Sequence, residues 1–120
     1  MSVEDTLEER GLRYGAFEEH ATIAQAIQDA YRIRPERWEK LPPVLKQGLT
    51  TIADKIARML NGDHMYEDNI HDIVGYGKLM EDWVRKQNVQ KTVDHENLLE
   101  QLRQSVKPED FSGIVAYNKS

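Results

Sequence analysis

The chain has 120 residues, a formal net charge of −5 and no cysteine. This length predicts one domain with a modest core, the acidic balance argues against a nucleic-acid-binding surface, and the lack of cysteine excludes disulfides and thiolate metal sites. The polar, acidic beginning and the absence of any run of roughly 18 apolar residues predict a soluble, cytoplasmic protein that enters no membrane.

Helical periodicity dominates the chain, and no segment alternates like a strand. The pattern predicts a short helix over residues 3–9 that stops at Gly11, and a longer helix over residues 17–32. Residues 35–43 are predicted to form a packed loop with one turn of helix. A second long helix is predicted to begin at the Pro42-Pro43 pair and to break at Gly62.

Two further helices are predicted in the C-terminal part of the chain. The third long helix covers residues 67–86, and a polar linker over residues 87–92 separates it from a last helix that Asp94 is expected to cap. The expected fold is one all-α domain over residues 1–120, a bundle of three long helices with a C-terminal helix. Its core is expected over about residues 7–86, with the C-terminal helix and tail over about residues 93–120.

The third long helix is expected to be covered on more than one side. Its apolar arc contains Ile70, Ile73, Val74, Gly77 and Met80, and this arc is wider than one neighbouring helix covers. Apolar surface on a small bundle is commonly covered by a second subunit, so we expect a homo-oligomer, in the simplest case a homodimer. Glycine inside a helix costs up to about 1 kcal/mol against alanine, and close approach of a neighbouring helix is expected at Gly77.

Asp72 places a carboxylate where the third long helix should carry apolar side chains. At roughly 100° per residue, it shares a stripe with Tyr76 and Trp83, and a carboxylate there needs a partner. One alternative is an ion pair with a neighbouring helix. The other is a shared Mg²⁺, because Asp68 stands one turn earlier on the same side and Mg²⁺ prefers oxygen ligands. Asn69 would add an amide oxygen beside both acids.

Glu19 and His20 precede Ile23 and Ile27 on the first long helix and are predicted to face its apolar side. An inward carboxylate needs a cation, a metal or an arginine, so Glu19 is a candidate metal ligand. The alternative for Glu19 is a contact with the N-terminal end of the helix dipole. A single inward histidine such as His20 is more often a hydrogen-bonded core residue than a ligand.

Lys55 and Arg58 lie at the margin of the apolar stripe of the second long helix. They either pair with the carboxylates of the third helix or bind phosphate oxygens beside a metal that those acids hold. Arg58 also stands four residues after Asp54, which predicts an ordinary surface ion pair.

Three blocks of the chain carry a resemblance to a known family. They read Arg13-Tyr14-Gly15-x-Phe17-x-x-His20-Ala21, Lys55-Ile56-Ala57-Arg58 and Asp68-Asn69-x-x-Asp72-Ile73-x-Gly75-Tyr76. In this order, over roughly residues 7–86, the blocks resemble a small all-helical family that phages and prophages carry. That family has no established activity.

More loosely, the chain resembles the MazG-like all-α nucleoside triphosphate pyrophosphohydrolases, in which acidic blocks on a helical bundle bind Mg²⁺. The resemblance implies Mg²⁺ binding by Glu19, Asp68 and Asp72, catalysis by Glu19 and Asp72, phosphate binding by Lys55 and Arg58, and further substrate contacts from Asn69, Tyr76 and Trp83. It implies cleavage of a nucleoside triphosphate between the α and β phosphorus atoms. The alternative is a non-enzymatic helical interaction module, such as a phage-encoded regulator or inhibitor of a host protein, in which Asp72 belongs to an ion pair.

Overall fold

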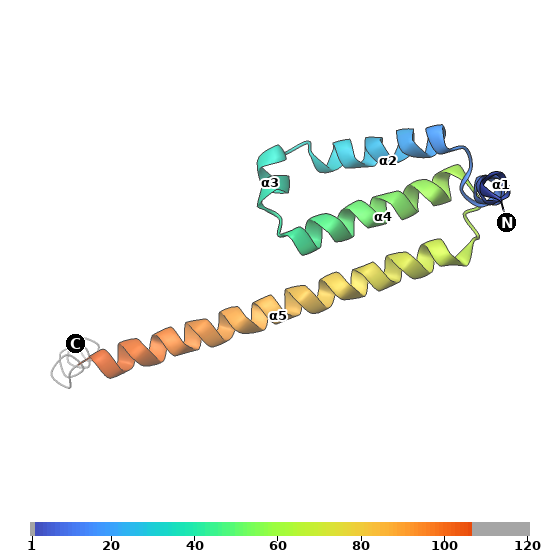
Figure 1. Cartoon of the computed structure of the whole chain (residues 1–120). Helices are drawn as coiled ribbons and strands as arrows, with labels where there is room; N and C mark the ends of the chain where they lie inside the picture. The colour runs from blue at the N-terminus through green and yellow to red at the C-terminus, as the bar shows by residue number, and fades with distance from the viewer. Residues whose placement is uncertain (1, 107–120) are drawn as a thin grey trace. The chain divides into compact units, whose positions relative to one another are not determined.

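The computed structural model describes residues 2–106, and all regular structure within them is helical (Figure 1). The helices are α1 (Val3–Tyr14), α2 (Phe17–Tyr31), α3 (Pro35–Lys40), α4 (Pro43–Asn61) and α5 (Glu67–Ser105). The chain divides into two compact units, of which the first ends at Trp83 and the second begins at Val84, within α5. The predicted all-helical class is confirmed for the described residues.

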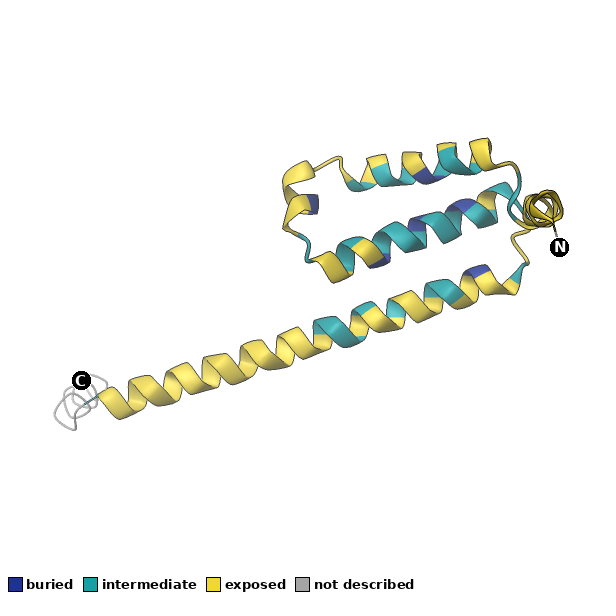
Figure 2. Cartoon of the chain, in the orientation of Figure 1, coloured by how far each residue is buried: buried dark blue, intermediate teal, exposed yellow. Residues whose placement is uncertain are grey.

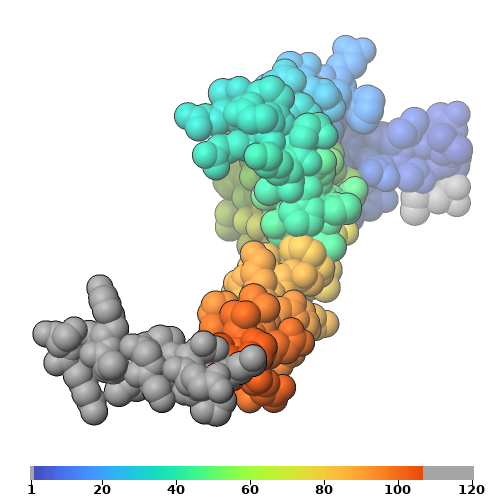
Figure 3. All heavy atoms as spheres, turned by 90° about the vertical axis from the view of Figure 1, so that its left-hand side faces the viewer, coloured from blue at the N-terminus to red at the C-terminus, as the bar shows by residue number. Residues whose placement is uncertain are grey.

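The boundaries of α2 and α4 agree with the sequence patterns. Pro43 occupies the first turn of α4, as the Pro-Pro pair predicts, and Gly62 caps its end. The segment expected as a loop with one helical turn forms α3, which begins at Pro35. Trp38 anchors this short helix because it is buried and its ring stacks on Tyr31, with the ring centroids 5.4 Å apart. Figure 3 shows α3 and the start of α4 together at one end of the first unit.

The predicted stop of the first helix at Gly11 is wrong, because α1 continues to Tyr14. Ser2 and Asp5 form a capping box at its start, and Glu9 pairs with Arg13 at 2.8 Å across the last turns. Gly11 adopts ordinary helical geometry, whereas Gly15 has a φ of 78° and ends the helix.

The predicted break after residue 86 is also wrong, because α5 runs without interruption through residues 87–92. This segment contains no glycine or proline, and polar residues with long side chains propagate a helix well. Asp94 therefore lies inside the helix instead of capping one, and its carboxylate accepts a hydrogen bond from the Gln90 amide at 2.9 Å. Residues 85–105 are exposed throughout.

The core of the first unit consists mainly of small residues on α4. This helix lies between α2 and the first part of α5, and its buried positions Ala53 and Ala57 are fully enclosed (Figure 2). At Gly48 an added Cβ would clash with the side chain of Met80, so glycine at this position of α4 leaves room for a side chain of α5. The expectation of close approach at Gly77 is wrong, because nothing lies within 4 Å of a Cβ at that position.

A hydrogen-bonded junction fastens the turn between α1 and α2 to the end of α4. The Asn61 side-chain amide donates to the carbonyls of Tyr14 at 2.8 Å and Ala16 at 2.9 Å, and the Asp63 amide donates to the Arg13 carbonyl at 2.7 Å. Gly15 fits this junction because an added Cβ would lie only 2.0 Å from the Asn61 carbonyl oxygen.

Gly15→Ala is expected to destabilise the protein, because alanine would be strained at this φ and would clash with Asn61. The backbone strain alone costs about 1–3 kcal/mol. Gly11→Ala is the matched control, since nothing lies within 4 Å of its added Cβ and alanine favours the helix by up to about 1 kcal/mol. Urea unfolding of both variants measures the difference, and equal stabilities would contradict the role of the junction.

Candidate functional site

A groove of about 680 Å³ lies between α1, the start of α2 and α4. Its apolar lining includes Val3, Leu7 and Tyr14, which recur along one face of α1, and Phe17 at the start of α2. Phe17 is 81% exposed, Val3 70% and Leu7 63%. The groove thus presents large apolar side chains that the first unit leaves in contact with solvent.

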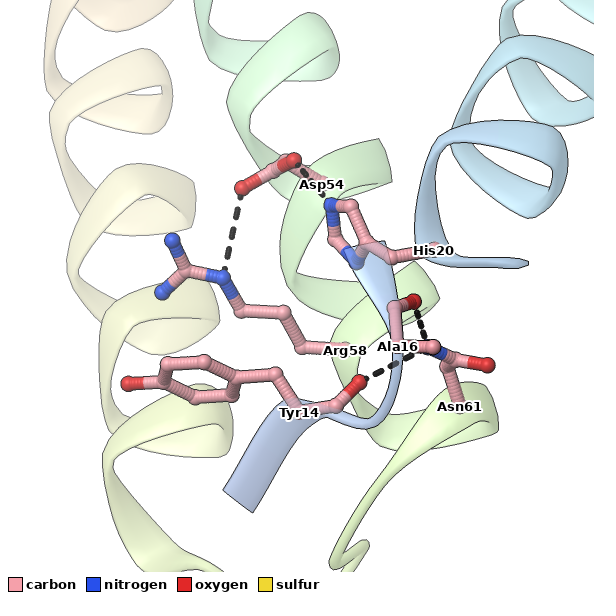
Figure 4. A network of polar contacts seen from close by, with 6 residues as sticks. All are labelled: Tyr14, Ala16, His20, Asp54, Arg58 and Asn61. Carbon is pink, nitrogen blue, oxygen red and sulfur yellow. Dashed lines mark hydrogen bonds and ion pairs between the residues drawn. The ribbon is translucent and has the colours of Figure 1, made fainter. Parts of the chain in front are cut away.

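A polar network forms the α4 side of the groove (Figure 4). The His20 Nε2 atom lies 2.8 Å from Asp54 Oδ1, and the Arg58 Nε donates toward Asp54 Oδ2 at 3.4 Å. Within the described residues, buried His20 Nδ1 has no hydrogen-bond partner. Both carboxylate oxygens of Asp54 therefore have a partner. The two contacts agree with the predictions that His20 is a hydrogen-bonded residue and that Asp54 pairs with Arg58.

Two guanidinium groups give the groove its positive charge. Arg58 lies over the Tyr14 ring at 4.4 Å from the centroid, and Arg10 lies 5.7 Å from the same centroid. Among residues 2–106, Arg10 has no ion pair, and the only ion pair of Arg58 uses its Nε atom. The Nη atoms of Arg58, whose side chain is 20% exposed, and the Arg10 guanidinium therefore have no ion-pair partner among these residues and can serve an anionic partner.

Asp72 forms an ion pair with Lys55, with 2.9 Å between the Lys55 Nζ and Asp72 Oδ2 atoms. The Lys55 side chain is 13% exposed and that of Asp72 is 40% exposed. The ion pair therefore links α4 to α5 at a position that solvent partly reaches. The hydrogen bond from Lys55 and its positive charge, with smaller contributions from His71 and Arg58, lower the pKa of Asp72. The ion pair that the structural alternative predicts is present.

Asp68 has a different partner from Asp72. Its carboxylate accepts a hydrogen bond from the Tyr66 hydroxyl at 2.8 Å, and the Arg13 guanidinium donates to the same hydroxyl at 3.0 Å. The hydrogen bond to Asp68 raises the pKa of Tyr66, although the nearby charge of Arg13 acts in the opposite direction. Asp68 is therefore tied to α1 through Tyr66.

The remaining predicted site residues are dispersed. Glu19 is exposed, not on the apolar side of α2 as its spacing predicts, because His20 and Ala24 define the buried side. Asn69 is 1% exposed, and its Nδ2 atom has no partner among the described residues. Tyr76 is 36% exposed, and Trp83 is half-buried. Within residues 2–106, no group of three or more acidic or histidine side chains is placed to hold a metal.

The contacts draw together the three sequence blocks described above. Tyr14 of the first block contacts Arg58 of the second, and Lys55 of the second block pairs with Asp72 of the third. Sequence reasoning missed the groove because Arg10 and Tyr14 belong to a helix whose second half it did not predict. The spacing of Val3, Leu7 and Tyr14 along the sequence could have predicted this apolar face of the helix.

Comparison of the chain with protein-family models, with curated proteins and with solved structures found no match. Among the described helices, none is both long enough and apolar enough to cross a membrane.

The Lys55–Asp72 pair is expected to make stability depend on pH in the acidic range. Because the pKa of Asp72 is lowered in the folded state, the stabilisation is present above about pH 4, the ordinary range for aspartate, and is lost as the pH falls through the lowered pKa. Lys55→Met should therefore lower the melting temperature at neutral pH, and the difference from the wild type should shrink in acid.

Lys78→Met is the matched control for this measurement. Lys78 pairs with Asp82 at 2.9 Å on the solvated side of α5, and its side chain is 61% exposed, so its removal should change stability by no more than about 0.5 kcal/mol. Melting curves recorded from neutral to acid pH for both variants test this. Equal effects of the two substitutions at neutral pH would contradict a structural role for the Lys55–Asp72 pair.

Proposed function

We propose that this protein is a non-enzymatic helical interaction module that binds its partner through the groove of α1, α2 and α4. The observation that carries the proposal is the ion pair of Asp72 with Lys55 at 2.9 Å. In the enzymatic alternative this carboxylate is a metal ligand whose charge Mg²⁺ neutralises. Lys55 already supplies that neutralisation within the fold.

The surroundings of the other acids support the same proposal. Asp68 accepts a hydrogen bond from Tyr66, and Glu19 is exposed on α2. A Mg²⁺-dependent pyrophosphohydrolase needs several carboxylates converging on one metal, because the metal must orient phosphate and water together. In this chain the three acids have three separate environments.

The groove supports an interaction role through its composition. Exposed apolar side chains beside a polar edge are characteristic of protein-docking surfaces, and a groove that follows a helix suits another helix. Phe17, Leu7 and Val3 are all more than half exposed, while Arg10 and Arg58 supply positive charge among the lining residues. A phage-encoded regulator of a host protein is the form of such a module that the sequence resemblance suggests.

Asp72→Asn separates the interaction module from a Mg²⁺-dependent hydrolase. If Asp72 serves the ion pair, the nearly isosteric change removes the attraction for Lys55, so the melting temperature should fall by the same amount in EDTA and in Mg²⁺. Wild-type protein should show no Mg²⁺-dependent rise. Asp82→Asn is the matched control, because its partner Lys78 is 61% exposed whereas Lys55, the partner of Asp72, is 13% exposed, and its effect should be smaller.

A screen of nucleoside triphosphates with Mg²⁺ or Mn²⁺ provides the activity measurement, and we expect no pyrophosphate release above the background of the buffer. Stabilisation of the wild type by Mg²⁺ that Asp72→Asn abolishes, together with pyrophosphate release, would overturn the proposal in favour of the hydrolase.

A further inference from the structure

Helix α1 is amphipathic, but its apolar face is not covered within the first unit. None of its 12 residues is buried, and Val3 and Leu7 remain 70% and 63% exposed. An isolated helix of this length is marginal in water, and helices in proteins gain most of their stability by packing an apolar face. A further element that packs on this face would stabilise α1.

The charges of α1 complement those of the groove. Glu4 and Glu8 follow Val3 and Leu7 directly, so they flank the apolar face of the helix. Neither glutamate has an ion pair within the described residues, and Arg10 in the groove also has none. A helix that places Val3 and Leu7 in the groove brings Glu4 and Glu8 alongside it, and Arg10 and Arg58 are among the residues that line it.

We infer that the occupant of the groove is α1 of a second copy of this chain, and that two copies pair through reciprocal α1 contacts. In such an isologous interface each copy offers the same helix and the same groove. Val3 and Leu7 of one copy pack beside Phe17 and Tyr14 of the other, and the flanking glutamates of each copy meet the arginines of the other. The inference rests on the proposed function in that the groove is a protein-docking surface.

The apolar part of the contact is tested by Leu7→Arg with Leu12→Arg as its matched control. Both leucines are exposed on α1, at 63% and 78%, but only Leu7 lines the groove. Sedimentation equilibrium at micromolar concentration should show a dimer for the wild type and for Leu12→Arg. Leu7→Arg should weaken dimerisation at least about tenfold, because a charge replaces an apolar side chain in the centre of the contact.

The charge complementarity is tested by two variants that leave the apolar residues intact. Arg10→Glu makes the groove repel the acidic helix, and Glu4→Arg with Glu8→Arg makes the helix repel the basic groove, so each variant alone should dimerise several-fold more weakly. An equimolar mixture should form a mixed dimer, since each groove then faces a helix of opposite charge. Native mass spectrometry identifies the mixed species, and circular dichroism verifies that all variants remain helical.

A monomeric wild type, equal disruption by Leu7→Arg and Leu12→Arg, or a mixture that stays monomeric would each overturn this inference. These outcomes are distinct from failure of the proposed function. Pyrophosphate release by a dimeric wild type would overturn the interaction module and leave the pairing intact. A monomeric wild type without hydrolysis would overturn the pairing and leave the module with a different partner.

Discussion

The packing of α2 against α4 through small side chains is the constraint on which the rest of the first unit depends. Gly48, Ala53 and Ala57 are all buried, and side chains this small let neighbouring helices approach until backbone and side-chain stems are in contact. Such a core buries little apolar area for the number of residues it orders. The large apolar side chains consequently lie at the margins of the unit, and several remain exposed, including Phe17 and Leu7.

Polar contacts between helices add to the stability that this small apolar core provides. Asn61 fastens the α1–α2 turn to the end of α4 through two backbone carbonyls, and Lys55 reaches Asp72 across the α4–α5 contact. Both contacts link segments far apart in the sequence, so they determine which helices lie together. The junction at Asn61 also holds the turn between α1 and α2, and the groove lies between α1, the start of α2 and α4. The contacts that hold the first unit together thus also shape the candidate site.

The sequence predicted some elements of this arrangement well and others poorly, for reasons that differ from residue to residue. The start of α4 at Pro43 was predicted because proline suits the first turn of a helix. The break expected after residue 86 was wrong because polarity changes which face is solvated without ending a helix, and residues 87–92 contain no glycine or proline to interrupt it. The sequence predicts that Asp72 needs a positively charged partner, but a lysine or arginine and a bound Mg²⁺ would both meet that need.

By itself, the sequence determined the helical class, the start and end of α2 and α4, and the demand of Asp72 for a compensating charge. These depend on neighbours within a few residues, where periodicity, proline and charge act directly. Only the tertiary structure decided that Lys55 meets Asp72, that Gly48 and not Gly77 lies against a side chain of another helix, and that Arg10 and Arg58 line one groove. Those outcomes depend on the relative placement of helices, which the local pattern of a single chain does not encode.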